Sequence, residues 1–302
     1  MNDYHIPVMA EESVALLGVK PDGAYADLTF GGGGHSSMIL ARLGGEGRLF
    51  SFDQDADAKE NAAAISDDRF RFIRSNFRFM RSQLRLEGIT ELDGVFADLG
   101  VSSHHFDTAE RGFSFRHDAR LDMRMNQSAK MSAYHIVNNY SNEQLTTIMR
   151  DWGELETPYK IANCIERARN SAPIETVGRL TEAVAPCTPK KDPSRFLSKL
   201  FQALRIEVNG EMEALKMALE QSLKVLKPGG RLVVISYHSL EDRLVKNFMR
   251  SGNFTGETEK DFFGKTNSPF DVITRKALTP TEEEIIKNPR SRSAKLRAAE
   301  KI

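Results

Sequence analysis

The sequence has too few cysteines to build a scaffold from them. Its two cysteines, Cys164 and Cys187, cannot form a disulfide framework or a zinc site of cysteines alone, and we expect no metal centre. No run of about 18 apolar residues is present that could span a membrane. The first residues, MNDYHIPVMAEESV, lack the apolar segment of a signal peptide. These absences predict a globular protein of the cytoplasm, without a membrane anchor.

An excess of charge of one sign is also missing, because 42 Lys and Arg balance 42 Asp and Glu. The total charge therefore indicates no partner, and only local clusters can do so. The first basic cluster comprises Lys190, Lys191, Arg195, Lys199 and Arg205. The second lies near the C-terminus and comprises Lys287, Arg290, Arg292, Lys295, Arg297 and Lys301. Such clusters are most often ordinary surface, but two of them in a chain without net charge favour a phosphate-binding face.

Short apolar runs alternate with helical patterns over the first hundred residues. The runs predicted as buried strands are 24–29, 48–53, 70–74 and 92–98. The segments predicted as helices between them are 36–43, 55–65 and 77–86. Repeated strand–helix units predict an α/β fold with a parallel sheet.

This alternation stops after Ser103 and resumes at 230–237, which has the pattern of another buried strand. Ser239 and Asp242 then form a predicted capping box at the start of the next helix. Near the end of the chain, the apolar run 270–274 could supply an antiparallel edge strand.

The residues between these two stretches have helical patterns. Ser141 and Gln144 form a capping box ahead of one amphipathic helix, and a long helix is predicted at 211–226. We therefore predict one α/β domain that is interrupted by a helical domain. The predicted parts are a first core segment at 1–103, an inserted helical substrate-recognition domain at 104–208, and a second core segment at 209–302 with a basic C-terminal tail.

Four glycines follow the first predicted strand in the stretch DLTFGGGGH, residues 27–35. A glycine-rich turn between a strand and a helix lets a ligand approach the backbone closely. A P-loop would need a Gly-Lys-Ser/Thr sequence, which is missing here, and a dinucleotide fingerprint would place its third glycine at Ser36. S-adenosylmethionine needs neither. Asp53 ends the second predicted strand and Asp98 the fourth, in the same crevice as the glycine loop, and Asp53 could accept hydrogen bonds from the adenosine ribose.

Several segments, in order along the chain, are similar to one known family. They are HIPVM (5–9), DLTFGGGGHS (27–36), FADLGVSS (96–103), RGFSFR (111–116), LDMRM (121–125), FQALRIEVN (201–209), ISYHSLEDRLVK (235–246) and NPRSRSAKLR (288–297). With these segments the sequence resembles the bacterial 16S ribosomal RNA (cytosine-N4)-methyltransferase family, called RsmH or MraW. The resemblance implies a Rossmann-like class I S-adenosylmethionine-dependent methyltransferase with an inserted all-helical domain. It also implies methylation of N4 of a cytidine in the decoding region of 16S ribosomal RNA, within the small ribosomal subunit, and it does not decide whether the protein is a homodimer.

By position, the family's cofactor contacts fall on residues of the glycine loop and the strand ends. They are Gly33, Gly34, His35, Asp53, Phe77, Asp98 and His105. At His105 the chain departs from the family, which usually continues Asp-Leu-Gly-Val-Ser-Ser-Pro-Gln where this chain has DLGVSSHH. An imidazole can donate or accept one hydrogen bond where the amide does both, so a contact there would depend on pH.

Methylation of cytosine N4 requires that a weakly nucleophilic amine is oriented and that its N–H groups meet hydrogen-bond acceptors. The candidate catalytic residues are Asp98, at one strand end, and Tyr237 and His238, at the end of the next strand. Because Asp98-Leu-Gly-Val lacks the Pro-Pro-aromatic sequence common in amino-methylases, the residues alone do not identify the proton acceptor. Phe113 and Phe115 alternate with arginines, and they could stack on single-stranded RNA or form a hydrophobic contact between the domains.

Three other functions fit parts of the sequence less well. A cytosine-C5 methyltransferase needs a cysteine nucleophile, and Cys187 lies inside the helical insertion instead of after the fourth strand. An inactive RNA-binding assembly factor would not need the glycine loop together with Asp53 and Asp98. An NAD-dependent enzyme is disfavoured by the spacing of the glycines.

Overall fold

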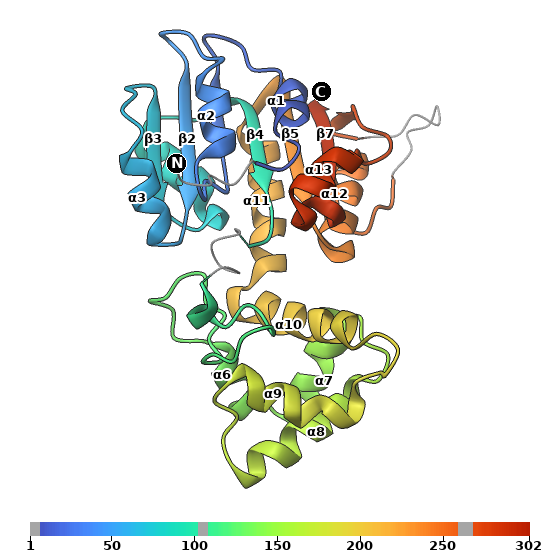
Figure 1. Ribbon diagram of the computed structural model, residues 1–302. Helices are drawn as coiled ribbons and strands as arrows, with labels where there is room; N and C mark the ends of the chain where they lie inside the picture. Colours follow the sequence, from blue (N-terminus) through green and yellow to red (C-terminus); the bar gives the residue numbers. More distant parts are fainter. Residues whose placement is uncertain (1–6, 102–107, 259–267) are drawn as a thin grey trace. The chain divides into compact units, whose positions relative to one another are not determined.

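The seven strands of the computed structural model, which describes residues 7–101, 108–258 and 268–302, form one mixed sheet (Figure 1). The strands are β1 (Ala24–Asp27), β2 (Arg48–Asp53), β3 (Phe70–Arg74), β4 (Leu92–Asp98), β5 (Leu226–Ser236), β6 (Phe270–Val272) and β7 (Lys295–Lys301). Their order is β3-β2-β1-β4-β5-β7-β6. Strands β1 to β5 are parallel, whereas β7 runs antiparallel to β5 and β6. The predicted α/β fold with its parallel strands and its antiparallel edge strand is therefore confirmed.

The chain divides into two compact units. The first, the sheet unit, comprises Met1–Gly100 and Met212–Ile302, and the second, the helical unit, comprises Val101–Glu211. The boundaries predicted from the sequence lie at 103/104 and 208/209. A helical segment is thus inserted into the α/β unit between β4 and β5.

Helices cover the sheet, and β5 shows why its sequence suits that position. Val233 and Ile235 pack in one apolar cluster with residues of α1 and α2, while the intervening Leu232 and Val234 line an apolar cavity with residues of α11. Alternate side chains of a strand point to opposite faces, so a continuous apolar run is expected where both faces are covered. The helices of this unit are α1 (Ala10–Leu17), α2 (Gly34–Leu40), α3 (Asp57–Ala63), α4 (Met80–Leu86), α11 (Glu211–Val225), α12 (Ser239–Ser251) and α13 (Glu282–Lys287), with the 3-10 turns η1 (Phe77–Phe79) and η4 (Pro289–Ser293).

The helical unit has its own core, to which Leu145 of α7, Ile161 of α8 and Leu200 of α10 contribute fully buried side chains. The predicted capping box at the start of α7 is present, because Ser141 and Gln144 each accept a hydrogen bond from the other's backbone N–H. The elements of this unit are α6 (Ala133–Asn139), α7 (Asn142–Asp151), α8 (Pro158–Ser171), α9 (Val177–Val184) and α10 (Pro193–Asn209), with the 3-10 turns η2 (Ala109–Arg111) and η3 (Ala185–Cys187).

The start of α12 differs from the prediction. The helix is capped by His238, whose imidazole accepts a hydrogen bond from the backbone N–H of Glu241, and not by Ser239 with Asp242. Asp242 cannot serve the cap because its carboxylate binds Arg297 at 2.7 Å and Lys295 at 3.2 Å. The capping box therefore lies one residue earlier than predicted.

The predicted basic C-terminal tail is wrong as a tail, because Lys295–Lys301 form β7 between β5 and β6. Arg297 is only 9% exposed and is paired with Asp242. The Lys301 ammonium group donates hydrogen bonds to the carbonyl oxygens of Leu223 and Leu226. Much of this positive charge therefore stabilises the sheet unit. No helix within the described ranges is both long enough and apolar enough to span a membrane.

Candidate functional site

Three aspartates end parallel strands at one edge of the sheet. Asp27 ends β1, Asp53 ends β2 and Asp98 ends β4. In the sheet register Asp27 is paired with Ser51 of β2 and with Phe96 of β4, so Asp53 and Asp98 each lie two residues beyond the level of Asp27 on its two sides. The carboxyl ends of parallel strands are where α/β sheets bind ligands, and this edge is the candidate site.

The glycine loop after β1 combines tight packing with open backbone. Gly31 and Gly33 have φ values of 53° and 79°, which favour glycine. A Cβ on Gly33 would meet the Phe30 ring at 2.8 Å, whereas a Cβ on Gly32 would meet nothing within 4 Å. The loop is thus packed against Phe30 on one side and leaves bare backbone at Gly32 for a ligand.

Asp27 holds both ends of this loop through hydrogen bonds to its carboxylate. Its carboxylate accepts hydrogen bonds from the Ser36 hydroxyl at 2.6 Å and from the Thr29 backbone N–H at 3.0 Å, and the Ser36 hydroxyl also contacts that of Ser51 at 2.7 Å. Burial raises the pKa of Asp27 to about 6. Ser36, which occupies the third glycine position of a dinucleotide fingerprint, therefore ties α2 to β1 and β2 through its hydroxyl.

Asp53 anchors the glycine loop in addition to its predicted role at the ribose. Its two carboxylate oxygens accept hydrogen bonds from the backbone N–H groups of Gly31 and Asp55, each at 2.9 Å. Asn61 of α3 donates to the carbonyl oxygen of Gly31 at 3.1 Å. We did not predict Asn61, because an amide in the middle of a helix carries no sequence signal of a contact 30 residues away.

The predicted contact Phe77 begins the 3-10 turn η1, next to a second polar link that the sequence did not reveal. The Asn76 side-chain amide donates to Gln54 at 2.8 Å, which joins the loops after β3 and β2. Asn76 also caps η1 by accepting a hydrogen bond from the backbone N–H of Arg78. Phe77 is therefore held beside the residue that follows Asp53.

Asp98 lies between Tyr237 and His35. The Tyr237 hydroxyl donates to one carboxylate oxygen at 2.8 Å, and His35 Nδ1 lies 3.9 Å from the other. Burial raises the pKa of Asp98 to about 7, and the nearby charges of Asp27 and Glu241 act in the same direction, while the hydrogen bond from Tyr237 opposes them. The Asp98 side chain keeps 22% of its surface exposed, so the carboxylate is still accessible.

His35 and His238 have different surroundings although both were predicted in the site. His35 Nε2 lies 3.0 Å from the carbonyl oxygen of Val8, and its ring packs on Phe96 with centroids 4.5 Å apart. His238 caps α12, and its Nε2 lies 3.2 Å from a carboxylate oxygen of Glu241. The structure therefore brings His35, Asp98 and Tyr237 together, whereas His238 faces Glu241. The predicted contact His105 lies outside the described residues.

These residues fit S-adenosylmethionine, the cofactor that the family resemblance implies. Bare backbone at Gly32 permits close approach of the methionine part, and Asp53 at the next strand end offers carboxylate oxygens for ribose hydroxyls. Desolvated carboxylates such as Asp98 favour a nearby positive charge, which the sulfonium and ammonium groups of this cofactor carry.

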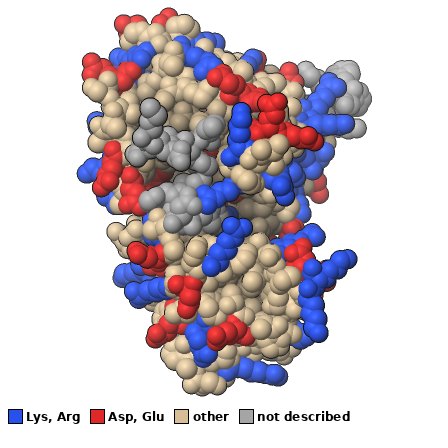
Figure 2. All heavy atoms as spheres, in the orientation of Figure 1, with Lys and Arg blue, Asp and Glu red and all other residues tan. Residues whose placement is uncertain are grey.

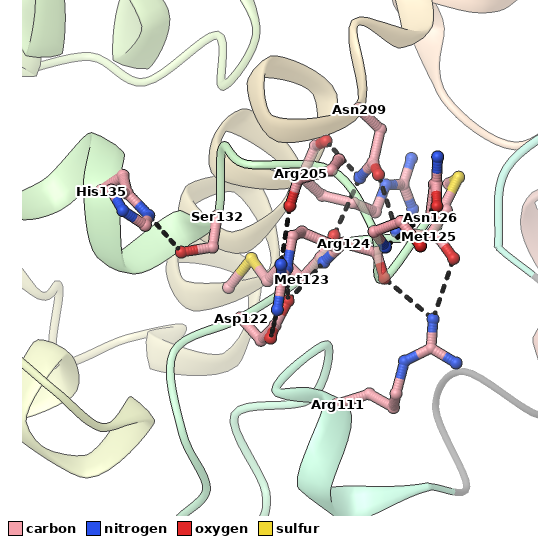
Figure 3. Close-up of polar contacts among 12 residues, drawn as sticks. Arg111, Asp122, Met123, Arg124, Met125, Asn126, Ser132, His135, Arg205 and Asn209 are labelled. Carbon is pink, nitrogen blue, oxygen red and sulfur yellow. Dashed lines mark hydrogen bonds and ion pairs between the residues drawn. The ribbon is translucent and has the colours of Figure 1, made fainter.

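The predicted RNA-stacking role of Phe113 conflicts with its burial in the helical unit. Phe113 is only 5% exposed and belongs to the core of that unit. Phe115 packs edge-on against Phe201 with ring centroids 5.7 Å apart. The Arg111 guanidinium lies 5.8 Å from the Phe113 ring centroid. It donates hydrogen bonds to the carbonyl oxygens of Arg124 at 2.8 Å and Met125 at 3.1 Å (Figure 3). Arg111, Phe113 and Phe115 therefore pack within the helical unit, whereas Arg116 is exposed.

The LDMRM segment forms a hydrogen-bonded strap inside the helical unit (Figure 3). Asn209 at the end of α10 accepts from the Met125 N–H at 2.8 Å and donates to the Met123 carbonyl at 2.9 Å. Asp122 pairs with Arg124 at 2.7 Å. Met123 has a φ of 60°, an uncommon value for a residue with a side chain. These contacts tie the segment to the end of α10.

The two basic clusters are only partly exposed. Lys190, Lys191 and Arg195 are exposed near the start of α10, whereas Lys199 donates to the Glu154 carbonyl at 3.0 Å and Arg205 pairs with Glu211 at 2.9 Å. In the C-terminal cluster, the exposed arginines of η4 are Arg290 and Arg292. On the face of the helical unit that Figure 2 shows, Lys and Arg side chains lie in separate groups, with Asp and Glu side chains between some of them.

The two cysteines lie side by side in the helical unit, with 3.0 Å between Cys164 Sγ and Cys187 Sγ. Burial raises the pKa of the Cys187 thiol to about 12. A nucleophilic cysteine needs a lowered pKa, so this environment disfavours the covalent mechanism of C5 methylation.

A family model and the similar proteins agree on one family over nearly the whole chain. A family model described as the MraW methylase family matches residues 2–302. The chain is 57% identical over 300 residues to the ribosomal RNA small subunit methyltransferase H of Parabacteroides distasonis, which covers 99% of this chain and 98% of the relative. It is 54% identical over 298 residues to the protein of the same name from Bacteroides fragilis, with 99% and 97% covered.

Proposed function

The chain belongs to the MraW methylase family, and from this premise we propose that it methylates N4 of a cytidine in the decoding region of 16S ribosomal RNA, with S-adenosylmethionine as the methyl donor. The observation that carries the proposal is the match along residues 2–302, with 57% identity to a ribosomal RNA small subunit methyltransferase H. The three strand-end aspartates and the glycine loop support it, because they give the arrangement that such a cofactor requires.

In this proposal S-adenosylmethionine, when bound, supplies a methyl group that a sulfonium centre already activates, so no protein nucleophile is needed. Asp53 accepts hydrogen bonds from the ribose hydroxyls and at the same time holds the Gly31 backbone. The bare backbone at Gly32 faces the methionine part. The other described residues that we propose as cofactor contacts are Gly33, Gly34, His35, Phe77 and Asp98.

We propose that Asp98 accepts the proton that the cytosine amine loses during methyl transfer. Its pKa of about 7 lets it exist as a carboxylate at neutral pH and still bind a proton as the N4 nitrogen becomes tetrahedral. Tyr237 donates to one oxygen of this carboxylate, which orients the other oxygen toward the amine. The assignment gives Asp98 and Tyr237 distinct roles and leaves His238 as a helix cap.

The RNA partner belongs to the same proposal. We propose that the protein acts in the cytoplasm on RNA within the small ribosomal subunit, and that the exposed cations Lys190, Lys191 and Arg195 bind phosphates. Arg290 and Arg292 are proposed as additional RNA contacts. A homodimer is compatible with this function but is not required by it.

The function is tested by the product. Incubation of the protein with methyl-labelled S-adenosylmethionine and either small subunits or naked 16S RNA should yield N4-methylcytidine on nucleoside mass spectrometry. Tritium at C5 of the cytosine should be retained, because direct transfer to N4 does not touch C5. Release of tritium, or methylation of another atom, would contradict the proposal. Cofactor binding by calorimetry without any methylated product would instead favour an RNA-binding assembly factor.

The basic cluster at the start of α10 should affect RNA binding and not cofactor binding. Neutralising Lys190, Lys191 and Arg195 together to glutamine should lower RNA affinity and flatten the plot of log affinity against log salt by roughly two to three units, because fewer counterions are released. The matched control replaces Lys216 and Lys224 of α11 by glutamine. An unchanged salt slope in the triple variant would return these residues to ordinary surface.

A further inference from the structure

Glu241 is a buried carboxylate that the proposed mechanism does not use. It lies in the first turn of α12 and is only 3% exposed. Its Oε2 accepts hydrogen bonds from the backbone N–H groups of Tyr237 at 2.9 Å and of His238 at 3.3 Å. Its Oε1 lies 3.2 Å from His238 Nε2. One side chain thus binds two consecutive residues of the turn between β5 and α12.

A helix cap alone explains only part of this arrangement. In a capping box the third residue of the helix reaches back to the N-cap N–H, which here is the contact between Glu241 and His238. The shorter contact goes one residue further back, to Tyr237. An ionised carboxylate is costly to bury, and several hydrogen bonds are needed to offset that cost. The hydrogen bond between Glu241 and the Tyr237 N–H is therefore additional to the capping box.

This additional hydrogen bond matters because of the contact that the Tyr237 hydroxyl makes. The Tyr237 backbone is held by Glu241, and its hydroxyl donates to Asp98 at the end of β4, 139 residues away in sequence. A ring that must place its hydroxyl within hydrogen-bond distance needs a fixed backbone, because a shift of about 1 Å at a positioning residue can lower a rate about a hundredfold. Glu241 provides that fixed point from α12.

We propose that Glu241 is a positioning residue for methyl transfer, which holds Tyr237 so that its hydroxyl orients Asp98 and which places a negative charge behind that pair. The inference rests on the proposed function, since it assigns Glu241 to the same site. It predicts two separable effects, one of geometry through Tyr237 and one of charge on Asp98.

The charge effect can be stated from the groups that face Asp98. They are Asp27 on β1, His35 on α2, Tyr237 after β5 and Glu241 on α12. Burial is the largest cause that raises the pKa of Asp98, and the charges of Asp27 and Glu241 add to it. Removing the charge of Glu241 should therefore lower the pKa of Asp98.

Two substitutions at Glu241 separate charge from geometry. Glu241→Gln keeps an oxygen that can accept from the two N–H groups but removes the charge, so we expect the acid limb of the kcat profile to move to lower pH, with a moderate fall in kcat of about tenfold or less. Glu241→Ala also removes the hydrogen bonds, and we expect kcat to fall about a hundredfold with little change in KM. S-adenosylmethionine affinity should stay within about twofold in both variants.

Asp242→Asn is the matched control. Asp242 is the next residue of the same helix and is also buried in ionic contacts, with Arg297 and Lys295. Its substitution should lower Tm while leaving kcat and the acid limb in place. If Asp242→Asn reproduced the effects of Glu241→Gln, a general loosening of α12 would explain both, and the proposal would be overturned.

A measurement without RNA distinguishes failure of this inference from failure of the proposed function. The Asp98 carboxyl carbon can be titrated by NMR in the wild-type protein, in Glu241→Gln and in Asp242→Asn. A lower pKa of Asp98 in Glu241→Gln alone supports the inference even if the RNA substrate is wrong. An unchanged pKa, or a Glu241→Ala effect on kcat that is fully additive with that of Tyr237→Phe, would overturn it, because residues that act through one another are not additive.

Discussion

Replacement of Asp98 by asparagine is expected to lower kcat for cytidine methylation by about 10²- to 10⁴-fold, the range that loss of a general base produces. The amide keeps the size of the side chain and retains an oxygen that can accept the hydrogen bond from Tyr237. The fold should therefore survive, and the loss should be in chemistry. Single-turnover rates with saturating RNA measure the effect, and a variant with wild-type kcat would remove Asp98 from the mechanism.

The same substitution makes a prediction about pH. If the carboxylate of Asp98 is the active form, wild-type kcat/KM should rise with pH through about 7, the pKa of this group in the folded protein. In Asp98→Asn the residual rate should lack this limb. A wild-type profile that is flat between about pH 6 and 8 would contradict the assignment.

The contribution of Asp98 to folding stability should fall with rising pH, whereas kcat/KM should rise. Burial raises the pKa of Asp98 from 3.8 to about 7, so between these values the folded protein binds more protons than the unfolded chain. Stability from this group therefore falls as pH rises through that window. Asp98→Asn does not titrate there, and its Tm should exceed that of the wild type near pH 8, with the difference shrinking toward pH 4. A destabilised variant at pH 8 would show that the carboxylate is needed for folding.

Replacement of Asp53 by alanine has the second large expected effect, on cofactor affinity. Loss of a charge-assisted contact to two ribose hydroxyls should weaken S-adenosylmethionine binding by roughly 1.5–3 kcal/mol, about ten- to a hundredfold, as measured by calorimetry. Because Asp53 also holds the Gly31 N–H, part of this loss could come from a displaced loop.

Asn61→Ala separates the two causes. Asn61 binds the same residue of the loop, through the Gly31 carbonyl at 3.1 Å, and is not among the proposed cofactor contacts. It should weaken binding only a fewfold. Equal losses in Asn61→Ala and Asp53→Ala would mean that Asp53 acts through the loop alone, and unchanged affinity in a folded Asp53→Ala protein would remove it from the site.

The sequence by itself determined the features that depend on neighbouring residues. Runs of five to seven residues rich in apolar side chains predicted the parallel strands β2, β3 and β4 with the bounds that the structure shows. A strand covered on both faces needs mostly apolar side chains, as in β4, whereas the edge strand β3 keeps two exposed arginines. Asp53 and Asp98 were predictable as strand ends, because a polar residue after such a run marks its end, whereas the first strand was predicted at 24–29 and ends at Asp27 in the structure. The glycine loop and the helical insertion were likewise local patterns, and the family resemblance supplied the chemistry.

Only the tertiary structure decided which of these residues meet. The hydrogen bond from Tyr237 to Asp98 joins residues 139 positions apart, and no local pattern encodes such a pair. Competition between partners also overrode local signals. The Asp242 carboxylate binds Arg297 of β7, and the helix is capped by His238 and Glu241 instead. Phe113 lies in the apolar core of the helical unit, where it cannot stack on RNA. Burial depends on how several segments pack together, so it cannot be predicted from one of them. It raises the pKa of Asp98 to about 7 and makes that carboxylate suited to accept a proton at neutral pH.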